Sequence, residues 1–334
     1  MVSAPTSIAL PEAVRALAEA DFGAVAARLR NAGFAVALPA PGILSVKATV
    51  PDPARASVLV SVGVHGDETG PIEMVAYLIE ALSQSPSALA VNLMLCVGNI
   101  DAIRLGKRFV DADLNRMFRA QRGDLAGTFE AGRADVLIEA TRAFFEGAGP
   151  VRWHFDLHTA IRPSHYPMFA IVPQLIAAPA RDDLIGWLGE AGIQAIIMNP
   201  ASAGTYSYFT SEHLGAAGST VELGRVGTLG QNDLSQFAAA SSALDRLLRG
   251  QPAQAAVSAP HVFDTAQSII KLSDAFTMSV GRETWNFTAL KKGDVIASDG
   301  DTVYTVKHDE ELVVFPNPDV RVGLRAGIMV VRTR

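Results

Sequence analysis

The stretch SVLVSVGVHGDETG, residues 57–70, decides the fold. Its first half is a nearly continuous run of small and β-branched residues, which predicts a strand that is buried on both faces of a sheet. The run ends at His65, and Glu68 follows three residues later in a loop of Gly, Asp and Thr. Both side chains are therefore expected beyond the carboxyl end of a strand, where open α/β sheets bind their ligands.

The rest of the first 250 residues alternates between strand patterns and helix patterns. Further apolar strands are predicted at 90–99, 152–160, 169–173, 194–199 and 219–224. Helices are predicted at 10–32, from Pro71 onward, and at 131–147, 180–192 and 232–249. This alternation predicts an α/β fold, with a mostly parallel, mixed central sheet and helices on both of its faces.

The composition and pattern of the sequence change near residue 250. RGQPAQAAVSAP, residues 249–260, is typical of a linker. The chain beyond it is rich in strand patterns, including a predicted hairpin around Asp299 and Gly300. We therefore expect two domains, a larger one at 1–250 and a small all-β domain at 251–334.

Composition excludes several classes of protein. The formal net charge of −6 argues against a general nucleic-acid binder. The single cysteine, Cys96, cannot form an internal disulfide, so any metal site must use histidine and carboxylate ligands. No window approaches the roughly 18 consecutive apolar residues of a membrane span, and acidic residues interrupt the N-terminal stretch where a secretory signal would stand. We expect a cytoplasmic protein without membrane or nucleic-acid partners.

His65 and Glu68 have a third candidate partner in His158, at the end of the predicted strand 152–160. Three such donors, with a fourth position left to water, are typical of a catalytic zinc site. Asp156 lies on the same strand face as His158 and could accept the other imidazole N–H. His154 has the same parity and could equally be the ligand by composition. The deeper position of His154 in the strand favours a core histidine. For His65 and Glu68, an isolated H-x-x-E pair is common by chance.

Residues 99–120, NIDAIRLGKRFVDADLNRMFRA, carry a local excess of positive charge in an acidic protein. Arginine binds a carboxylate through two parallel hydrogen bonds, so this segment suits a small anionic substrate. Composition alone favours a different interpretation, a solvated and charged surface helix.

Glu222 stands within the predicted apolar strand 219–224. A buried carboxylate without a partner is costly, and its pKa rises. Such a group could act as a general base that takes a proton from water and passes it on. The residues allow equally well a glutamate at a strand end that pairs with an arginine such as Arg225.

Taken together, these segments resemble the succinylglutamate desuccinylases of the desuccinylase/aspartoacylase group, which is related to the zinc carboxypeptidases. The matching stretches are GVHGDETGPIEM, GKRFVDADLNRMF, VRWHFDLHTAIR, SEHLGAAGSTVELG and GQNDLSQFA. The likeness continues through 289–308 and 312–330 and covers most of the chain beyond about residue 50. It implies a zinc-carboxypeptidase-like fold, in which residues 1–250 form the catalytic domain.

The resemblance also implies a metal site and a catalytic residue. One zinc ion per subunit is expected on His65, Glu68 and His158. Glu222 is expected to act as catalytic base and acid. The implied reaction is hydrolysis of the amide bond of N-succinyl-L-glutamate to succinate and L-glutamate, in arginine breakdown by the succinyl pathway. Oligomers are possible.

Three residues of the basic segment receive roles from the same resemblance. Arg108 is expected to help polarise the amide carbonyl. Asn115 and Arg116 are expected to bind a carboxylate of the small anionic N-acyl amino acid substrate.

Some positions depart from the family pattern. Asp67 stands where many desuccinylases have Asn, and Tyr208 stands where a histidine is common. Aspartoacylases carry an arginine shortly before the catalytic glutamate, and residues 211–220 contain none, which disfavours N-acetylaspartate as substrate. The residue that binds the succinyl carboxylate is therefore open, with Arg162 and Arg225 as candidates.

Three alternative functions share this sequence pattern. A deacylase of another N-acyl amino acid would differ only in its acyl pocket. A zinc carboxypeptidase would need an open cleft for a peptide. A non-catalytic binding protein with the same fold is expected to have lost a ligand or the base, and His65, Glu68, His158 and Glu222 are all present.

Overall fold

The computed structural model describes residues 9–256 and 258–333. The α-helices are α1 (Glu12–Ala18), α2 (Gly23–Asn31), α3 (Thr69–Gln84), α4 (Ile100–Leu105), α5 (Phe129–Phe145), α6 (Ala178–Glu190), α7 (Tyr206–Leu214) and α8 (Ala238–Leu248). Short 3₁₀ turns are η1 (Pro86–Ala88), η2 (Leu114–Arg116), η3 (Gly123–Leu125) and η4 (Leu234–Phe237).

The strands before residue 250 are β1 (Ala35–Ala37), β2 (Ile43–Lys47), β3 (Ser57–Val62), β4 (Asn92–Val97), β5 (Arg152–Ala160), β6 (Met168–Pro173), β7 (Ala195–Asn199) and β8 (Ala217–Arg225). The later strands are β9 (His261–Ile270), β10 (Thr277–Met278), β11 (Thr288–Lys291), β12 (Val295–Asp299), β13 (Thr302–Thr305), β14 (Glu310–Val314) and β15 (Arg325–Arg332).

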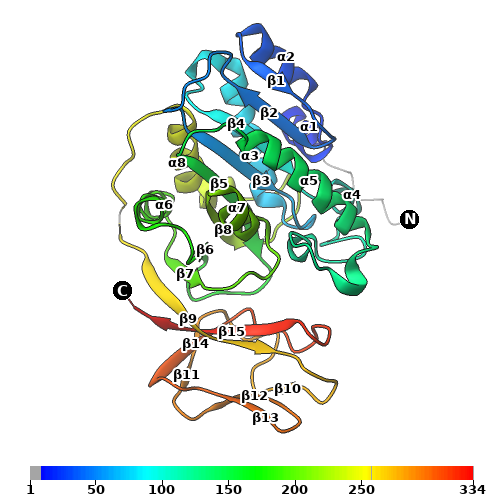
Figure 1. The fold of residues 1–334 in the computed structure, drawn as a ribbon, viewed down its shortest axis with the longest axis vertical. Helices are drawn as coiled ribbons and strands as arrows, with labels where there is room; N and C mark the ends of the chain where they lie inside the picture. The colour runs from blue at the N-terminus through cyan, green and yellow to red at the C-terminus, as the bar shows by residue number, and fades with distance from the viewer. Residues whose placement is uncertain (1–8, 257, 334) are drawn as a thin grey trace, which may run out of the picture.

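One mixed sheet runs through the molecule, in the order β1-β2-β4-β3-β5-β8-β6-β7-β9-β15-β14-β11 (Figure 1). Its centre is parallel, because β4, β3, β5 and β8 all run in one direction. β6 is antiparallel to β8, and β7 and β9 follow the direction of β6. The carboxyl ends of β3, β5 and β8 therefore lie side by side. These strand ends form one edge of the sheet, across the strands, and the candidate residues lie at this edge.

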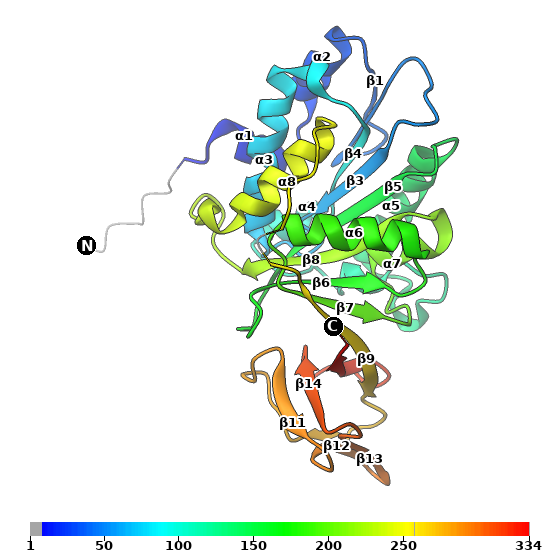
Figure 2. The ribbon, with the colours of Figure 1, turned by 90° about the vertical axis from the view of Figure 1, so that its left-hand side faces the viewer.

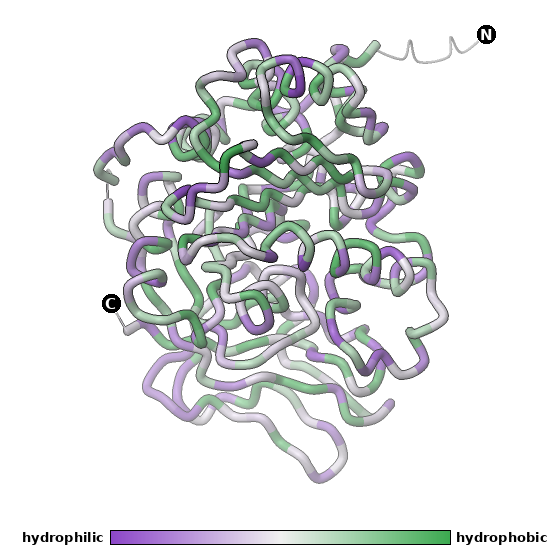
Figure 3. The backbone as a smooth tube through the Cα atoms, turned by 45° about the horizontal axis from the view of Figure 1, so that its top comes forward, coloured by the Kyte–Doolittle hydropathy of each residue, from purple (hydrophilic) through white to green (hydrophobic). Residues whose placement is uncertain are grey.

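Helices cover both faces of the part of this sheet that precedes residue 250, as predicted (Figure 2). Successive strand residues point to opposite faces, so Val58 and Val60 pack with α1, α2, α3, α6 and α8, whereas Leu59 packs with α5 and α7. Figure 3 shows the apolar residues concentrated along the central strands and the hydrophilic ones mainly on outer loops. Cys96 is buried on the face that α5 and α7 cover, and burial raises the pKa of its thiol to about 12.

The single helix predicted at 10–32 is wrong, because the structure has two helices there. Ala20 adopts a left-handed backbone conformation (φ 60°), which ends the helical path after α1. The Asp21 carboxylate then accepts a hydrogen bond from the backbone N–H of Gly23 (2.9 Å) at the start of α2. Apolar spacing continues across this break, so periodicity alone does not reveal it.

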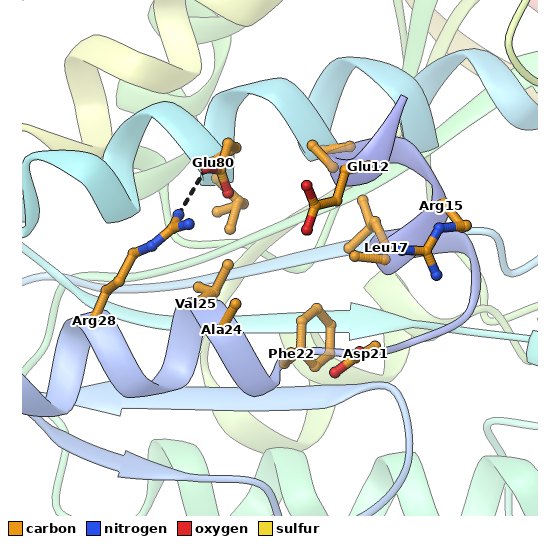
Figure 4. A pocket seen from close by; sticks show the side chains of 13 residues that line it. Glu12, Arg15, Leu17, Asp21, Phe22, Ala24, Val25, Arg28 and Glu80 are labelled. Atoms are coloured by element: carbon orange, nitrogen blue, oxygen red, sulfur yellow. Dashed lines mark hydrogen bonds and ion pairs between the residues drawn. The ribbon is translucent and has the colours of Figure 1, made fainter. Parts of the chain in front are cut away.

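A pocket lies between α1, α2 and α3 (Figure 4). Its rim carries the ion pair of Arg28 Nη1 with Glu80 Oε1 (2.7 Å). None of its lining residues belongs to the candidate active site described below.

The C-terminal part is joined to the larger part by β9. The first residues of β9 pair with β7, and its later residues pair with β15. The predicted hairpin at Asp299 and Gly300 is present as β12 and β13, which form a second, three-stranded sheet with β10. The proposed division at 250/251 falls between α8 and β9 and stays a prediction. Across residues 9–256 and 258–333, no helix is both long enough and apolar enough to span a membrane.

Candidate active site

The loop after β3 turns sharply and presents His65 and Glu68 at the sheet edge. Gly63 has a positive φ (62°), which glycine tolerates without strain. Gly66 packs against α4 so closely that an added Cβ would lie 2.3 Å from the carbonyl carbon of Ala102. Its N–H donates to the carbonyl oxygen of Arg108 (3.1 Å). The glycines of this loop therefore let it lie directly on α4.

His65, Glu68 and His158 converge on one point. His65 Nδ1 lies 2.8 Å from Glu68 Oε1, and His158 Nδ1 lies 2.8 Å from Glu68 Oε2. The two Nδ1 atoms are 3.2 Å apart. All three side chains are buried, and one donor atom from each lies within 4.8 Å of the others. The cluster can hold a metal ion.

The far nitrogen of each imidazole is held by an aspartate. His158 Nε2 lies 2.9 Å from Asp156 Oδ2, the contact that the sequence predicted. His65 Nε2 lies 2.9 Å from Asp113 Oδ1, and this partner was not predicted. An Nε2–H that donates to a carboxylate leaves the Nδ1 lone pair free to bind a metal ion. The donor set therefore fits a divalent cation of the zinc type.

The surrounding charges favour a cation at this point. Burial and Arg108 act to lower the pKa of His65, but Glu68 and Asp113 outweigh them and raise it. Burial also opposes the charged form of His158, yet Asp156 and Glu68 raise its pKa well above the usual value. The same carboxylates that stabilise protons on the two rings also stabilise a bound metal ion. Protons and a metal ion therefore compete for the ring nitrogens.

Glu222 faces the cluster from the neighbouring strand. Its Cα is the register partner of His158 in the parallel pair of β5 and β8. The side chain is 8% exposed, and its Oε2 has no hydrogen-bond partner among the described residues. Burial, and next the negative charge of Glu68, raise the pKa of Glu222 to about 7. A carboxyl group with this pKa can exchange a proton near neutral pH.

Arg108, Asn115 and Arg116 all reach the same edge. Arg108 Nη1 donates to Glu68 Oε1 (2.7 Å). Asn115 is buried, and its Oδ1 accepts from the backbone N–H of Tyr206 (2.8 Å), at the start of α7. The Arg116 side chain is 35% exposed, and its Nη1 donates to the carbonyl oxygen of Asn115 (2.7 Å). The Arg108 side chain is exposed to a similar extent, 32%, so both guanidinium groups are accessible to a substrate.

Glu130 organises the segment that carries these residues, and sequence reasoning missed it. It is fully buried, and Val110 N (2.6 Å) and Ala112 N (3.1 Å) donate to its carboxylate. Asn99 Nδ2 also donates to it (2.9 Å). An acidic residue in the first turn of a helix is common, so its position in α5 gave no signal of this role. The basic segment is α-helical only over α4 and has a single 3₁₀ turn at η2, so the surface-helix interpretation is wrong beyond Leu105.

His154 does not join the cluster. Its Nε2 lies 2.9 Å from Ser61 Oγ, and its Nδ1 lies 2.8 Å from Thr210 Oγ1. The edge of its ring packs on Tyr206. Burial lowers the pKa of His154 to about 4, so the ring is a neutral core residue with both nitrogens satisfied.

The structure places the two residues that depart from the family pattern and the two candidates for the succinyl carboxylate as follows. Asp67 has a buried Oδ1 without a hydrogen-bond partner among the described residues. The hydroxyl of Tyr208 donates to the carbonyl oxygen of Pro200 (3.3 Å). Arg225 is exposed at the end of β8, whereas Arg162 is half-buried beyond the end of β5.

Comparison with known proteins assigns the family. The family model described as succinylglutamate desuccinylase/aspartoacylase catalytic domain matches residues 54–248. The chain belongs to this family. A second model, the AstE/AspA barrel-sandwich hybrid domain, matches residues 258–333, so family-like sequence extends through the C-terminal part.

Relatives of the family match nearly the full length. A succinylglutamate desuccinylase of Burkholderia orbicola is 46% identical over 295 residues, which cover 87% of this chain and 86% of the relative. The solved structure of the Vibrio cholerae succinylglutamate desuccinylase has a TM-score of 0.83 at 31% identity and covers 90% of this chain and 88% of that one. The Chromobacterium violaceum enzyme of the same name has a TM-score of 0.78 at 34% identity, covering 93% and 98%.

Proposed function

We propose that this protein is a zinc-dependent amide hydrolase that cleaves N-succinyl-L-glutamate to succinate and L-glutamate. The observation that carries the proposal is the convergence of His65, Glu68 and His158 beside Glu222, whose Oε2 is buried and unpartnered among the described residues. The names of the 46%-identical relatives support the choice of substrate. Action in the cytoplasm, in arginine breakdown by the succinyl pathway, is part of the same proposal.

The metal ion would be held by His65, Glu68 and His158, one ion per subunit. When bound, zinc supplies Lewis acidity and lowers the pKa of a coordinated water toward about 7. Asp113 and Asp156 hold the two imidazoles in the tautomer that this role requires.

The chain's own groups perform the proton transfers and bind the substrate. Glu222 takes a proton from the attacking water and delivers it to the nitrogen of the departing glutamate, and its burial, which raises its pKa, favours this exchange. Arg108 lies beside Glu68 and polarises the acyl carbonyl. Asn115 and Arg116 bind a carboxylate of the glutamate end. In this role Arg116 offers a partly exposed guanidinium, and the carbonyl oxygen of Asn115 orients it by accepting from its Nη1.

A substrate panel tests this function. The purified protein is assayed for release of glutamate or aspartate from N-succinyl-L-glutamate, N-acetyl-L-glutamate, N-acetyl-L-aspartate and a short peptide, with and without a chelator. We expect the highest kcat/KM with N-succinyl-L-glutamate and loss of activity with the chelator. Preference for another acyl group would favour a different N-acyl amino acid deacylase. Preference for the peptide would favour a carboxypeptidase.

A further inference from the structure

Arg162 lies at the catalytic edge with most of its hydrogen-bonding capacity unused. It stands two residues beyond the end of β5 and four residues beyond His158. Its Nε donates to the carbonyl oxygen of Arg282 (2.8 Å), in the C-terminal part. Within residues 9–256 and 258–333, neither terminal nitrogen of Arg162 makes a hydrogen bond or an ion pair. A half-buried guanidinium with two free nitrogens is suited to bind a planar anion.

The C-terminal part fixes the segment that carries Arg162. The backbone N–H of Asn286 donates to the carbonyl oxygen of Pro163 (3.0 Å), and that of His165 donates to the carbonyl oxygen of Asn286 (3.1 Å). The ring of His165 packs on Trp285, with centroids 5.2 Å apart. Asn286 is itself fully buried. These contacts fix the backbone next to Arg162, so the Cα from which its side chain extends has a defined position.

The charges around Arg162 are mostly of its own sign. Burial lowers its pKa, and the positive charges of Arg282 and Arg108 lower it further, with Glu283 acting in the opposite direction. Arg282 and Arg108 already have carboxylate partners, Asp319 (2.6 Å) and Glu68 (2.7 Å). Of these three arginines, only Arg162 has no carboxylate ion pair among the described residues, so its guanidinium is the one available to a bound anion.

We propose that Arg162 binds the terminal carboxylate of the acyl group and thereby selects succinyl substrates. The inference rests on the proposed function, in which Arg108 polarises the acyl carbonyl and Arg116 holds the glutamate end. A succinyl carboxylate lies two methylene groups from that carbonyl, on the side away from the glutamate. Arg162 lies in the loop after the strand of the third ligand, whereas Arg116 lies in the segment between α4 and α5, and we assign the two arginines to different ends of the substrate.

The C-terminal part thus determines specificity through the backbone carbonyl of Arg282, which orients the Arg162 guanidinium. Arg225, the other candidate for this carboxylate, is exposed and lacks such a contact among the described residues. Arg162 is therefore the specificity-determining residue, and the C-terminal part is its positioning element.

A matched pair of substrates tests this role. N-butanoyl-L-glutamate has the length of N-succinyl-L-glutamate, with a methyl group in place of the terminal carboxylate. We expect the wild type to prefer the succinyl substrate. Arg162→Met should lower kcat/KM for the succinyl substrate about 10- to 100-fold, mainly through KM, and leave the butanoyl substrate nearly unchanged. Arg162→Lys keeps the charge but not the paired geometry, and should give an intermediate preference.

The control is Arg321→Met, which removes an exposed arginine of the C-terminal part and should leave both substrates unaffected. Equal losses for both substrates in Arg162→Met, or no loss, would overturn the inference while the hydrolase function stands. If Arg162→Met does not fold, the ratio of the two substrates in Arg162→Lys decides in the same way. Failure of the wild type to hydrolyse either substrate would instead overturn the proposed function, and the inference with it.

Discussion

His158 and Glu222 are register partners on two adjacent parallel strands, β5 and β8. Because the strands run in the same direction, both side chains reach the same sheet edge. The imidazole directs its Nδ1 toward Glu68, and Glu222 has a buried oxygen without a partner among the described residues. A proposed metal ligand and a proposed base are thus fixed relative to each other by main-chain hydrogen bonds.

Replacement of Glu222 tests the proton-transfer role. Glu222→Gln keeps the shape of the side chain but cannot accept a proton, so we expect turnover to fall about 100- to 10,000-fold. The assay is glutamate release at saturating N-succinyl-L-glutamate. Metal content, measured by elemental analysis, should equal that of the wild type. An active Glu222→Gln enzyme would show that another group is the base.

Two histidines on β5 allow a matched test of the metal site. His158→Ala removes a proposed ligand, so the purified protein should contain less zinc than the wild type. His154→Gln changes a histidine on the same strand whose two nitrogens bind Ser61 and Thr210, and should lower stability without lowering zinc content. Elemental analysis of the two variants, prepared in parallel, separates the roles. The reverse result would make His154 the ligand.

Asp113 is expected to act on the metal through His65. Asp113→Asn weakens the hydrogen bond to His65 Nε2, so zinc affinity should fall about 10- to 100-fold. The measurement is competition for zinc against a chelator of known affinity. Asp101→Asn provides the control, because Asp101 is half-exposed and pairs only with Arg104 in the described structure (3.2 Å). Unchanged affinity in Asp113→Asn would mean that the contact does not orient the ring.

Substrate binding is expected to require the planar guanidinium group of Arg116. Arg116→Lys keeps a positive charge but loses the paired hydrogen bonds to a carboxylate, so KM for N-succinyl-L-glutamate should rise about tenfold or more. Steady-state kinetics at several substrate concentrations measure the change. A KM close to that of the wild type would argue against a carboxylate clamp at this position.

Acid stability should depend on Glu311. The side chain is buried, and burial alone would raise its pKa, but Gln267, the N–H of Lys307 and His308 outweigh burial and lower it. A lowered folded-state pKa adds stability above the ordinary glutamate value of about 4.3, and this stability disappears as the pH falls through the folded value. The melting temperature of Glu311→Gln should therefore lie below that of the wild type at pH 7. The gap should narrow below about pH 4.3.

Local patterns were sufficient to predict much of the fold and one contact of the candidate site. The run at 57–62 predicted a buried strand, and β3 is buried along its whole length. Alternation along 152–160 placed Asp156 on the face of His158, and the two side chains are hydrogen-bonded. Local patterns proposed His158 as a third donor but left His154 open by composition, and the family resemblance selected His158.

Other features depend on tertiary contacts that no local pattern encodes. Ala20 ends α1 in a left-handed conformation that alanine does not favour, so the residue type gave no warning. Asp113 and Glu130 look like ordinary surface acids in sequence, and only the folded chain brings them to His65 and to the backbone around Val110. The preference for Arg162 over Arg225 likewise depends on Arg282, which is 120 residues away.

The position of β9 has a consequence for any attempt to shorten the protein. β7 pairs with β6 on one side and with β9 on the other, so a chain cut at residue 250 would end before the strand that covers β7. The main-chain N–H and C=O groups of 195–199 would then form a free sheet edge, apolar on both faces, which invites edge-to-edge aggregation. A fragment truncated in this way should be poorly soluble even with every proposed metal ligand intact.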